Sequence, residues 1–134
     1  MSGSDNIKTI KAVYEAFGRG DVGFIIGSVT DDVDWATETT SDGAPWYGKH
    51  KGKSGVGDFF EAFGKASEVE EFTPLAFAAT DDGDVLTVVR FAVRSRETGR
   101  QATMHLHHYF RFTNGKISYY RGSEDTAITA SLFA

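Results

Sequence analysis

The sequence predicts an α+β domain in which helices precede a curved antiparallel sheet. Two observations support this class. Apolar residues recur at helical spacing in three segments of the first half, and four long segments with alternating apolar residues follow in the second half, joined by short turns that contain glycine. In this order, helices cover one face of the sheet and leave the other face for solvent or a partner. Long twisted strands would curl around the helices and enclose a pocket.

The first helix is predicted over residues 5–19, with Asp5 as its N-terminal cap and Gly18 near its end. Asp21 is expected to cap a second, shorter helix with the sequence VGFIIGSV. The apolar stripe of the first helix consists of Ile7, Ile10, Val13, Tyr14 and Phe17. This stripe predicts one buried helix face.

A short strand is predicted over residues 33–38, followed by a glycine-rich loop over residues 41–55. Loops of this length in compact domains are often functional. A third helix follows the loop, because four apolar residues again recur at helical spacing. These residues are Val56, Phe59, Phe60 and Phe63.

Four strands are predicted over residues 69–79, 85–96, 101–113 and 116–124. The turns TDDGD, RETGR and TNGK each contain a glycine that can adopt positive φ, so the strands should form an antiparallel meander. The tail TAITASLFA follows Asp125 and is expected to form one or two helical turns. The 134 residues are thus expected to form one domain.

The composition excludes several classes of function. The chain has no cysteine, which rules out thiol catalysis, disulfides and thiolate zinc sites. Its net charge of -5 argues against nucleic-acid binding, because the basic residues gather only in the short run of Lys49, Lys51 and Lys53. No stretch approaches the ~20 apolar residues of a membrane helix. The N-terminus MSGSDNIKTI has no secretory pattern, so we expect a cytoplasmic protein without membrane or nucleic-acid partners.

Aromatic residues are abundant, with eleven Phe, five Tyr and two Trp. This surplus suits either an aromatic-lined hollow that binds an apolar small molecule or a large apolar interface. Trp35 and Trp46 are the expected substrate contacts, since a flat aromatic ring can hold a planar ligand at little entropic cost. Trp46 lies in the predicted loop, where it could form a lid, whereas Trp35 could instead fill the core.

His108 is the first catalytic candidate. Alternation along TMHLHHYFRF places it in a row with Met104, Leu106, Phe110 and Phe112. An imidazole in an apolar row must find a hydrogen-bond partner or line a cavity, because an unpaired buried polar group costs ~1–3 kcal/mol. A histidine can also exchange protons near neutral pH. The alternative is a core histidine bonded to a helix residue.

His105 and His107 share the opposite face of this strand with Tyr109 and Arg111. Two histidines at this spacing without a nearby carboxylate are weak metal ligands, so we expect no metal site and no cofactor. The mixed aromatic and polar surface is instead suited to sheet-to-sheet packing, which predicts a homodimer.

Taken in order, these features resemble a known family. They comprise a helix opened by Gly20 and Asp21, the strand DDVDW, a glycine-flanked third helix and a meander that ends TNGKI, followed by Arg121 and DTA. Together they are similar to the SnoaL-like group of the nuclear transport factor 2 and ketosteroid isomerase superfamily. The resemblance implies a cone-shaped sheet wrapped around the three N-terminal helices. It also implies cofactor-independent proton transfer next to a carbonyl, in isomerisation or aldol-type cyclisation. A non-catalytic ligand-binding or dimerisation domain of this fold is the alternative.

The resemblance also implies roles for single residues. His108 lies seven residues before Gly115, where the family places a polar side chain that points into the cone. Tyr14 falls where the isomerases keep a second donor to the substrate oxygen, and Glu38 falls near their general base. Ser123 replaces the tyrosine of the SnoaL-like pattern.

The last strand leaves two rows open. Arg121 alternates with Tyr119 and Ser123, whereas Tyr120 and Glu124 belong to the other row. The SnoaL-like pattern favours Arg121 inside, and the isomerase register favours Tyr120 and Glu124. The catalytic candidates are therefore His108, Glu38, Tyr14 and Glu124, and the substrate-binding candidates are Trp35, Trp46, Tyr120, Arg121 and Phe60.

Overall fold

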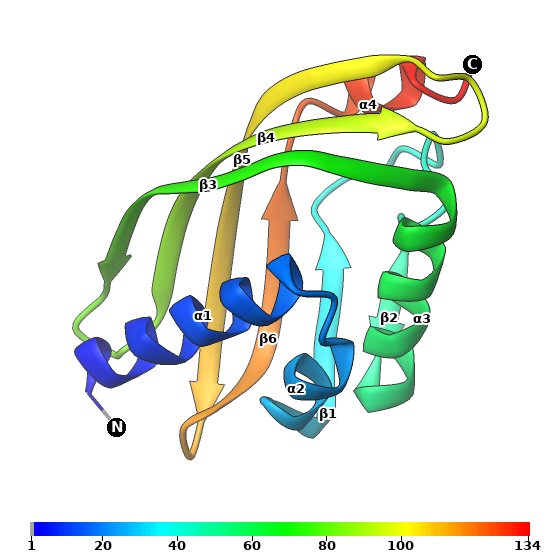
Figure 1. Cartoon of the computed structure of the whole chain (residues 1–134). Coiled ribbons are helices and arrows are strands. Elements are labelled where there is room, and N and C mark those ends of the chain that lie inside the picture. Colours follow the sequence, from blue (N-terminus) through cyan, green and yellow to red (C-terminus); the bar gives the residue numbers. More distant parts are fainter. Residues whose placement is uncertain (1) are drawn as a thin grey trace.

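A computed structural model describes residues 2–134 and shows one strongly curved sheet with the three N-terminal helices packed inside the curve (Figure 1). The helices are α1 (Gly3–Gly18), α2 (Val22–Gly27), α3 (Gly52–Ala66) and α4 (Thr126–Ser131). The strands are β1 (Val29–Thr37), β2 (Lys49–Lys51), β3 (Ser67–Ala79), β4 (Val85–Ser95), β5 (Gln101–Thr113) and β6 (Lys116–Ser123). The predicted α+β class is confirmed.

The six strands form a single sheet in the order β2-β1-β6-β5-β4-β3. The predicted meander is present, because β3, β4, β5 and β6 pair with one another in chain order and antiparallel. The sheet is nevertheless mixed, since β1 runs parallel to β6. That parallel pair brings the N-terminal strand beside the last strand, so residues far apart in the sequence can line the same interior.

The helix caps differ from prediction at one position. Ser2 caps α1 by accepting a hydrogen bond from the Asp5 amide, so Asp5 lies in the first turn and is not the cap itself. Its carboxylate accepts a hydrogen bond from the Ser2 hydroxyl at 2.8 Å, so the two side chains are also linked to each other. Asp21 caps α2 and Asp125 caps α4, both as predicted.

The predicted loop over residues 41–55 is shorter in the structure. Strand β2 occupies Lys49–Lys51 and pairs with β1, and α3 already begins at Gly52. Strand β2 was not predicted, because an edge strand of charged residues has no alternating apolar pattern. Gly52 adopts φ 73°, which allows the chain to turn directly from β2 into α3.

The interior side chains of the meander follow the predicted alternation. Met104, Leu106 and Phe110 of β5 are buried, and half-buried His108 lies in the same row. On the opposite face of the sheet, Arg90 and Arg94 form partly exposed ion pairs with glutamates of β3. Pairs at such exposed positions contribute little to stability.

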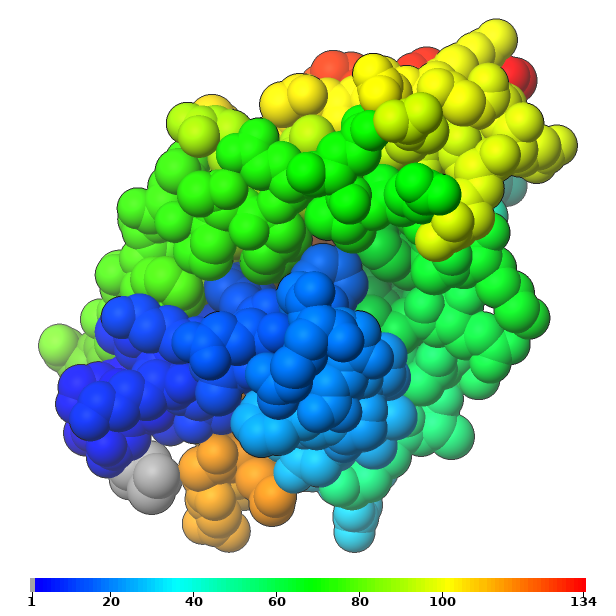
Figure 2. Space-filling view, in the orientation of Figure 1, coloured from blue at the N-terminus to red at the C-terminus, as the bar shows by residue number. Residues whose placement is uncertain are grey.

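Helices α1 and α2 pack below β3 and cover the front of the interior (Figure 2). Among residues 2–134, no helix combines the length and the apolar character that crossing a membrane would require.

Candidate active site

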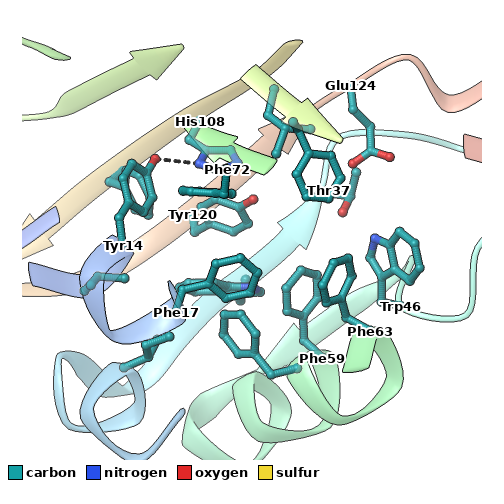
Figure 3. Close-up of a pocket in the computed structure, with 17 residues that line it drawn as sticks. Tyr14, Phe17, Thr37, Trp46, Phe59, Phe63, Phe72, His108, Tyr120 and Glu124 are labelled. Atoms are coloured by element: carbon teal, nitrogen blue, oxygen red, sulfur yellow. Dashed lines mark hydrogen bonds between the residues drawn. The ribbon is translucent and has the colours of Figure 1, made fainter. Parts of the chain in front are cut away.

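A cavity lies between the helices and the concave face of the sheet (Figure 3). Its interior volume is about 80 Å³, and the empty space rises to about 690 Å³ only when the solvent-open mouth is included. The lining is mainly aromatic: Tyr14, Phe17, Trp35, Trp46, Phe59, Phe60, Phe63, Phe72, Phe91, Phe110 and Tyr120. Most of the aromatic surplus in the sequence therefore surrounds this cavity.

Two polar lining residues, Thr37 and His108, belong to one row of residues that crosses four strands. Thr37 of β1 pairs with Gly122 of β6, Gly122 with His108 of β5, and His108 with Thr87 of β4. Residues aligned across a sheet in this way point to the same face. Parallel pairing of β1 with β6 is thus what brings Thr37 into line with His108.

Tyr14 of α1 connects to this row through its hydroxyl. The Tyr14 oxygen lies 2.6 Å from His108 Nδ1 and 2.7 Å from Thr87 Oγ1. Tyr14 and Thr87 are both buried. The three side chains form one short hydrogen-bond chain from helix to sheet, shown in part by the dashed line in Figure 3.

The proton positions in this chain follow from the rule that buried donors need acceptors. If His108 Nδ1–H donated to Tyr14, Tyr14 would donate to Thr87, and the Thr87 hydroxyl hydrogen would have no recorded acceptor among the described residues. If Thr87 donates to Tyr14 and Tyr14 donates to Nδ1, the one hydrogen left over is on Nε2 of His108, which lines the cavity, whereas Thr87 is not among the lining residues. The second arrangement costs less. It leaves His108 as the tautomer with its proton on Nε2.

Burial governs the ionisation of these groups. Burial lowers the pKa of His108 to about 3, and the neighbouring His107 adds a smaller effect in the same direction. Burial also raises the pKa of Tyr14, although its hydrogen bond with Thr87 partly opposes this. At neutral pH both side chains are therefore uncharged, and His108 can act as a hydrogen-bond donor.

Tyr120 lies over Gly122, and the missing side chain of the glycine makes room for the Tyr120 hydroxyl. A Cβ atom at position 122 would stand 2.2 Å from the Tyr120 oxygen. The Tyr120 ring stacks on Trp35 at a centroid distance of 4.2 Å, and burial raises the pKa of Tyr120 well above its usual value. Its hydroxyl stays protonated and can donate to a ligand beside His108.

Glu124 is the only carboxylate among the described residues that line the cavity. In Figure 3 it lies at the end occupied by Thr37 and Trp46, whereas Tyr14 and His108 lie at the other end. The cavity therefore has donors at one end and an acceptor at the other, with apolar walls between them.

The structure moves two predicted site residues out of the cavity. Glu38 and Arg121 lie on the outer face of the sheet, where Arg121 forms an ion pair with Asp34 at 3.0 Å. The physical reason is strand alternation: because Thr37 and Gly122 face inward, their neighbours Glu38 and Arg121 face outward. The expectation that Glu38 and Arg121 line the interior is wrong, and the Tyr120 and Glu124 row faces the cavity.

The remaining predicted residues do line the cavity: Tyr14, Trp35, Trp46, Phe60, His108, Tyr120 and Glu124. Trp46 is buried and packs edge-on against Phe63, so it is a wall of the cavity rather than an exposed lid. The indole N–H of Trp35 is buried and has no hydrogen-bond partner among the described residues. Such an unpaired donor is free for a ligand acceptor.

Three polar residues near the site were not predicted. Thr87 anchors Tyr14, and Tyr47 and Thr129 both donate to Glu124. Thr87 lies in an alternating strand, so its face could have been inferred from the pattern. Nothing in the sequence shows that Tyr47 in the loop and Thr129 in the tail meet at the same carboxylate.

Comparisons with known proteins agree with this architecture. The family model described as a SnoaL-like domain matches residues 10–120. No curated protein matches the chain.

Among solved structures, an NTF2-like protein of unknown function from Burkholderia pseudomallei is 26% identical, with a TM-score of 0.83 and 98% of each chain covered. A protein described as a candidate isomerase from Bacillus subtilis is 16% identical, with a TM-score of 0.84, over 99% of this chain and 96% of that chain. A protein from Mesorhizobium loti described as a candidate SnoaL-like polyketide cyclase is 20% identical, with a TM-score of 0.71, over 87% of this chain and 96% of that chain. The latter two likenesses show the shared fold.

Proposed function

Because the chain belongs to the SnoaL-like domain family, we propose that it is a small-molecule enzyme that transfers a proton next to a carbonyl group of an apolar substrate. One observation carries this proposal: a neutral histidine and, among the described residues, a single carboxylate line the same aromatic cavity. The reaction would be an isomerisation or an aldol-type cyclisation and would need no cofactor. The names of the Bacillus and Mesorhizobium neighbours favour the same reaction class.

In the proposed reaction, the substrate carbonyl oxygen accepts a hydrogen bond from His108 Nε2–H and another from the Tyr120 hydroxyl. Glu124 removes a proton from the adjacent carbon. The electron pair of the broken C–H bond forms the enolate double bond, and negative charge moves to the oxygen. Preorganised donors in a water-poor site stabilise such an oxyanion better than water does. Protonation of a different carbon, or attack of the enolate on a second carbonyl, completes the reaction.

The surrounding residues suit an apolar substrate with at least one planar ring. Trp35, Trp46 and Phe60 contribute flat walls, and the cavity has no cationic side chain among its described lining residues. Tyr14 holds the His108 ring in place and keeps the proton on Nε2, so its role is to orient the donor.

A ligand-binding domain without turnover is the second candidate. The outward position of Glu38 favours it, because Glu38 is the base that the resemblance to the isomerases implied. Glu124 would then contribute to ligand recognition only.

Proton exchange distinguishes the two candidates. We would incubate the protein with 2-tetralone or a steroid ketone in D₂O and follow loss of the α-proton signals by NMR. We expect wild type to accelerate exchange, and Glu124→Gln and His108→Ala each to lose on the order of 10²-fold. Glu38→Gln is the matched control and should exchange as wild type does. Binding without exchange would favour the second candidate, and the absence of both would reject an interior small-molecule site for these ketones.

A further inference from the structure

The Glu124 carboxylate is held asymmetrically. The Tyr47 hydroxyl donates to Oε2 at 2.8 Å, and the Thr129 hydroxyl donates to the same oxygen at 2.5 Å. No hydrogen bond to Oε1 is found among the described residues. One carboxylate oxygen is therefore saturated with neutral donors, and the other keeps its lone pairs for a ligand.

The two donors come from separate segments that are fixed independently of Glu124. Tyr47 lies in the loop before β2, where its amide donates to the Ala44 carbonyl and its ring packs edge-on against Trp46. Thr129 is buried in α4. The loop and α4 are in close contact, since a Cβ added to Gly43 would stand 2.6 Å from the Ala130 side chain.

Both hydroxyls have properties that suit a permanent donor. Burial raises the pKa of Tyr47; a hydrogen bond with Thr129 partly opposes this, and the negative charges of Glu124 and Asp125 add to the rise. The hydroxyl of Tyr47 therefore stays protonated at neutral pH. The Thr129 hydroxyl has one hydrogen, and its nearest acceptor is Glu124 Oε2 at 2.5 Å, since the Asp125 carbonyl at 3.2 Å and Met104 Sδ at 3.7 Å are farther away.

We propose that Tyr47 and Thr129 are positioning residues that hold Glu124 by Oε2 and present Oε1 to the substrate. The inference rests on the proposed function, in which Glu124 accepts the proton from carbon. A base whose carboxylate cannot rotate keeps its free oxygen in line with the C–H bond, and this orientation lowers the barrier by reducing the entropy lost in the transition state. The two donors touch Glu124 and not the reacting atoms, so they act through the base.

This arrangement also explains why the cavity ends where it does. The loop, the end of β6 and α4 are joined at one carboxylate oxygen, and Trp46 and Glu124 both line the adjacent wall. A shift of either segment would rotate the carboxylate. The loop and the tail are therefore parts of the reactive site even though neither is proposed to supply a reacting group.

Three variants test the proposal. Tyr47→Phe and Thr129→Val each remove one hydroxyl with little change in shape, and Thr129→Ser restores the hydroxyl. In the 2-tetralone exchange assay, we expect the first two to lower kcat by about tenfold with KM changed by less than about twofold, a smaller loss than that from removing the base. Thr129→Ser should remain within about twofold of wild type. Tyr109→Phe is the matched control, because it removes a tyrosine-to-carboxylate hydrogen bond, to Asp84, outside the cavity lining.

Crystal structures of the same variants give a readout that does not need turnover. We expect the Glu124 carboxylate to rotate in Tyr47→Phe or in Thr129→Val and to keep its orientation in Thr129→Ser and Tyr109→Phe. Unchanged orientation in both hydroxyl-deletion variants would overturn the positioning role, and so would unchanged kcat in both. If wild type catalyses no exchange, the proposed function fails, while the crystallographic comparison still decides whether the two hydroxyls set the orientation of Glu124.

Discussion

His108 combines two properties that rarely occur together in a histidine. It is neutral because burial lowers its pKa, and it still has one ring nitrogen without a recorded partner among the described residues. The Tyr14 hydroxyl supplies the hydrogen bond that selects the tautomer. His108 can therefore donate a hydrogen bond from Nε2–H to a ligand while the ring stays uncharged.

The lowered pKa of His108 predicts how stability depends on pH. In the unfolded chain a histidine ionises near ~6.5, whereas in the folded protein burial lowers the pKa of His108 to about 3. Between these values the unfolded state binds the proton and the folded state does not. Stability should therefore fall as the pH drops from 7 towards 4, by at most ~1.4 kcal/mol per pH unit from this residue.

Urea unfolding at pH 7 and pH 5 measures this effect. The free energy of unfolding should decrease more in wild type than in His108→Gln, because the variant lacks the group that takes up the proton on unfolding. Equal decreases in the two proteins would contradict the lowered pKa.

Gly122 makes room for the hydroxyl of Tyr120, which lines the cavity. Replacing it with alanine would place a methyl group where the Tyr120 hydroxyl now lies, so Tyr120 must move towards Trp35 or into the cavity. We expect Gly122→Ala to cost about 1–3 kcal/mol, the usual range for overpacking a core. Gly64→Ala is the control, since a Cβ there would meet nothing within 4 Å. Thermal unfolding measures both, and equal melting temperatures would show that the residues around Tyr120 can rearrange freely.

At the scale of single residues, the sequence predicted more of the cavity than of its polar partners. Alternation in β5 and the family resemblance together placed His108 and Tyr14 inside. The outward position of Glu38 could not be predicted, because the register of β1 against β6 depends on a pairing between distant strands. Tyr47 and Thr129 could not be found, since their meeting point depends on how a loop and a tail fold back together.

Helix α4 is the element most directly tied to the site. Asp125 caps it by accepting a hydrogen bond from the Ile128 amide at 3.1 Å, and Thr129 in its second turn holds Glu124. A helix of six residues has little intrinsic stability and depends on its cap and its packing. Loss of the cap should therefore also disturb the position of the Glu124 carboxylate at the end of the cavity.

Asp125→Ala tests this dependence. We expect a loss of about 1 kcal/mol in the free energy of unfolding and faster amide exchange in α4, because the cap acceptor is gone. Asp125→Ser should keep most of the stability, since serine is also a good cap. Urea unfolding and hydrogen exchange measure the two effects. Unchanged exchange in α4 would show that packing alone holds the helix.

Elements with a strong apolar pattern were predicted well. β5 has the predicted bounds, and the other strands of the meander differ by one or two residues. β2 was missed because its three residues are charged or polar and their pairing with β1 is purely backbone. Helix α1 begins earlier than predicted, because Ser2 and not Asp5 is its cap. Both residue types can cap a helix, so the choice between them depends on local geometry.

The outer face of the sheet has an exposed groove in which apolar side chains lie beside charged ones. The groove is lined by apolar and aromatic side chains, including Leu86 and Tyr119, together with His107 and Arg121. Leu86 remains 44% exposed, and the Tyr119 ring lies against the guanidinium groups of both Arg111 and Arg121. An exposed apolar surface bordered by charges suits association with a second copy of the chain.

We predict a symmetric dimer through this face. Light scattering at micromolar concentration should give twice the mass of one chain. Leu86→Lys should shift the protein towards monomer, because each copy would bring a positive charge to the shared interface. Leu75→Lys is the control, because Leu75 is similarly exposed but does not line the groove. A wild-type protein that is monomeric under these conditions would refute the dimer.

Both tryptophans of the chain are walls of the cavity, and the indole nitrogen of Trp35 has no partner among the described residues. The tryptophan emission of the protein therefore originates entirely from rings that line the cavity. Titrating candidate compounds while recording that emission would report occupancy without any label, and Trp35→Phe would separate the signal of one wall from that of the other.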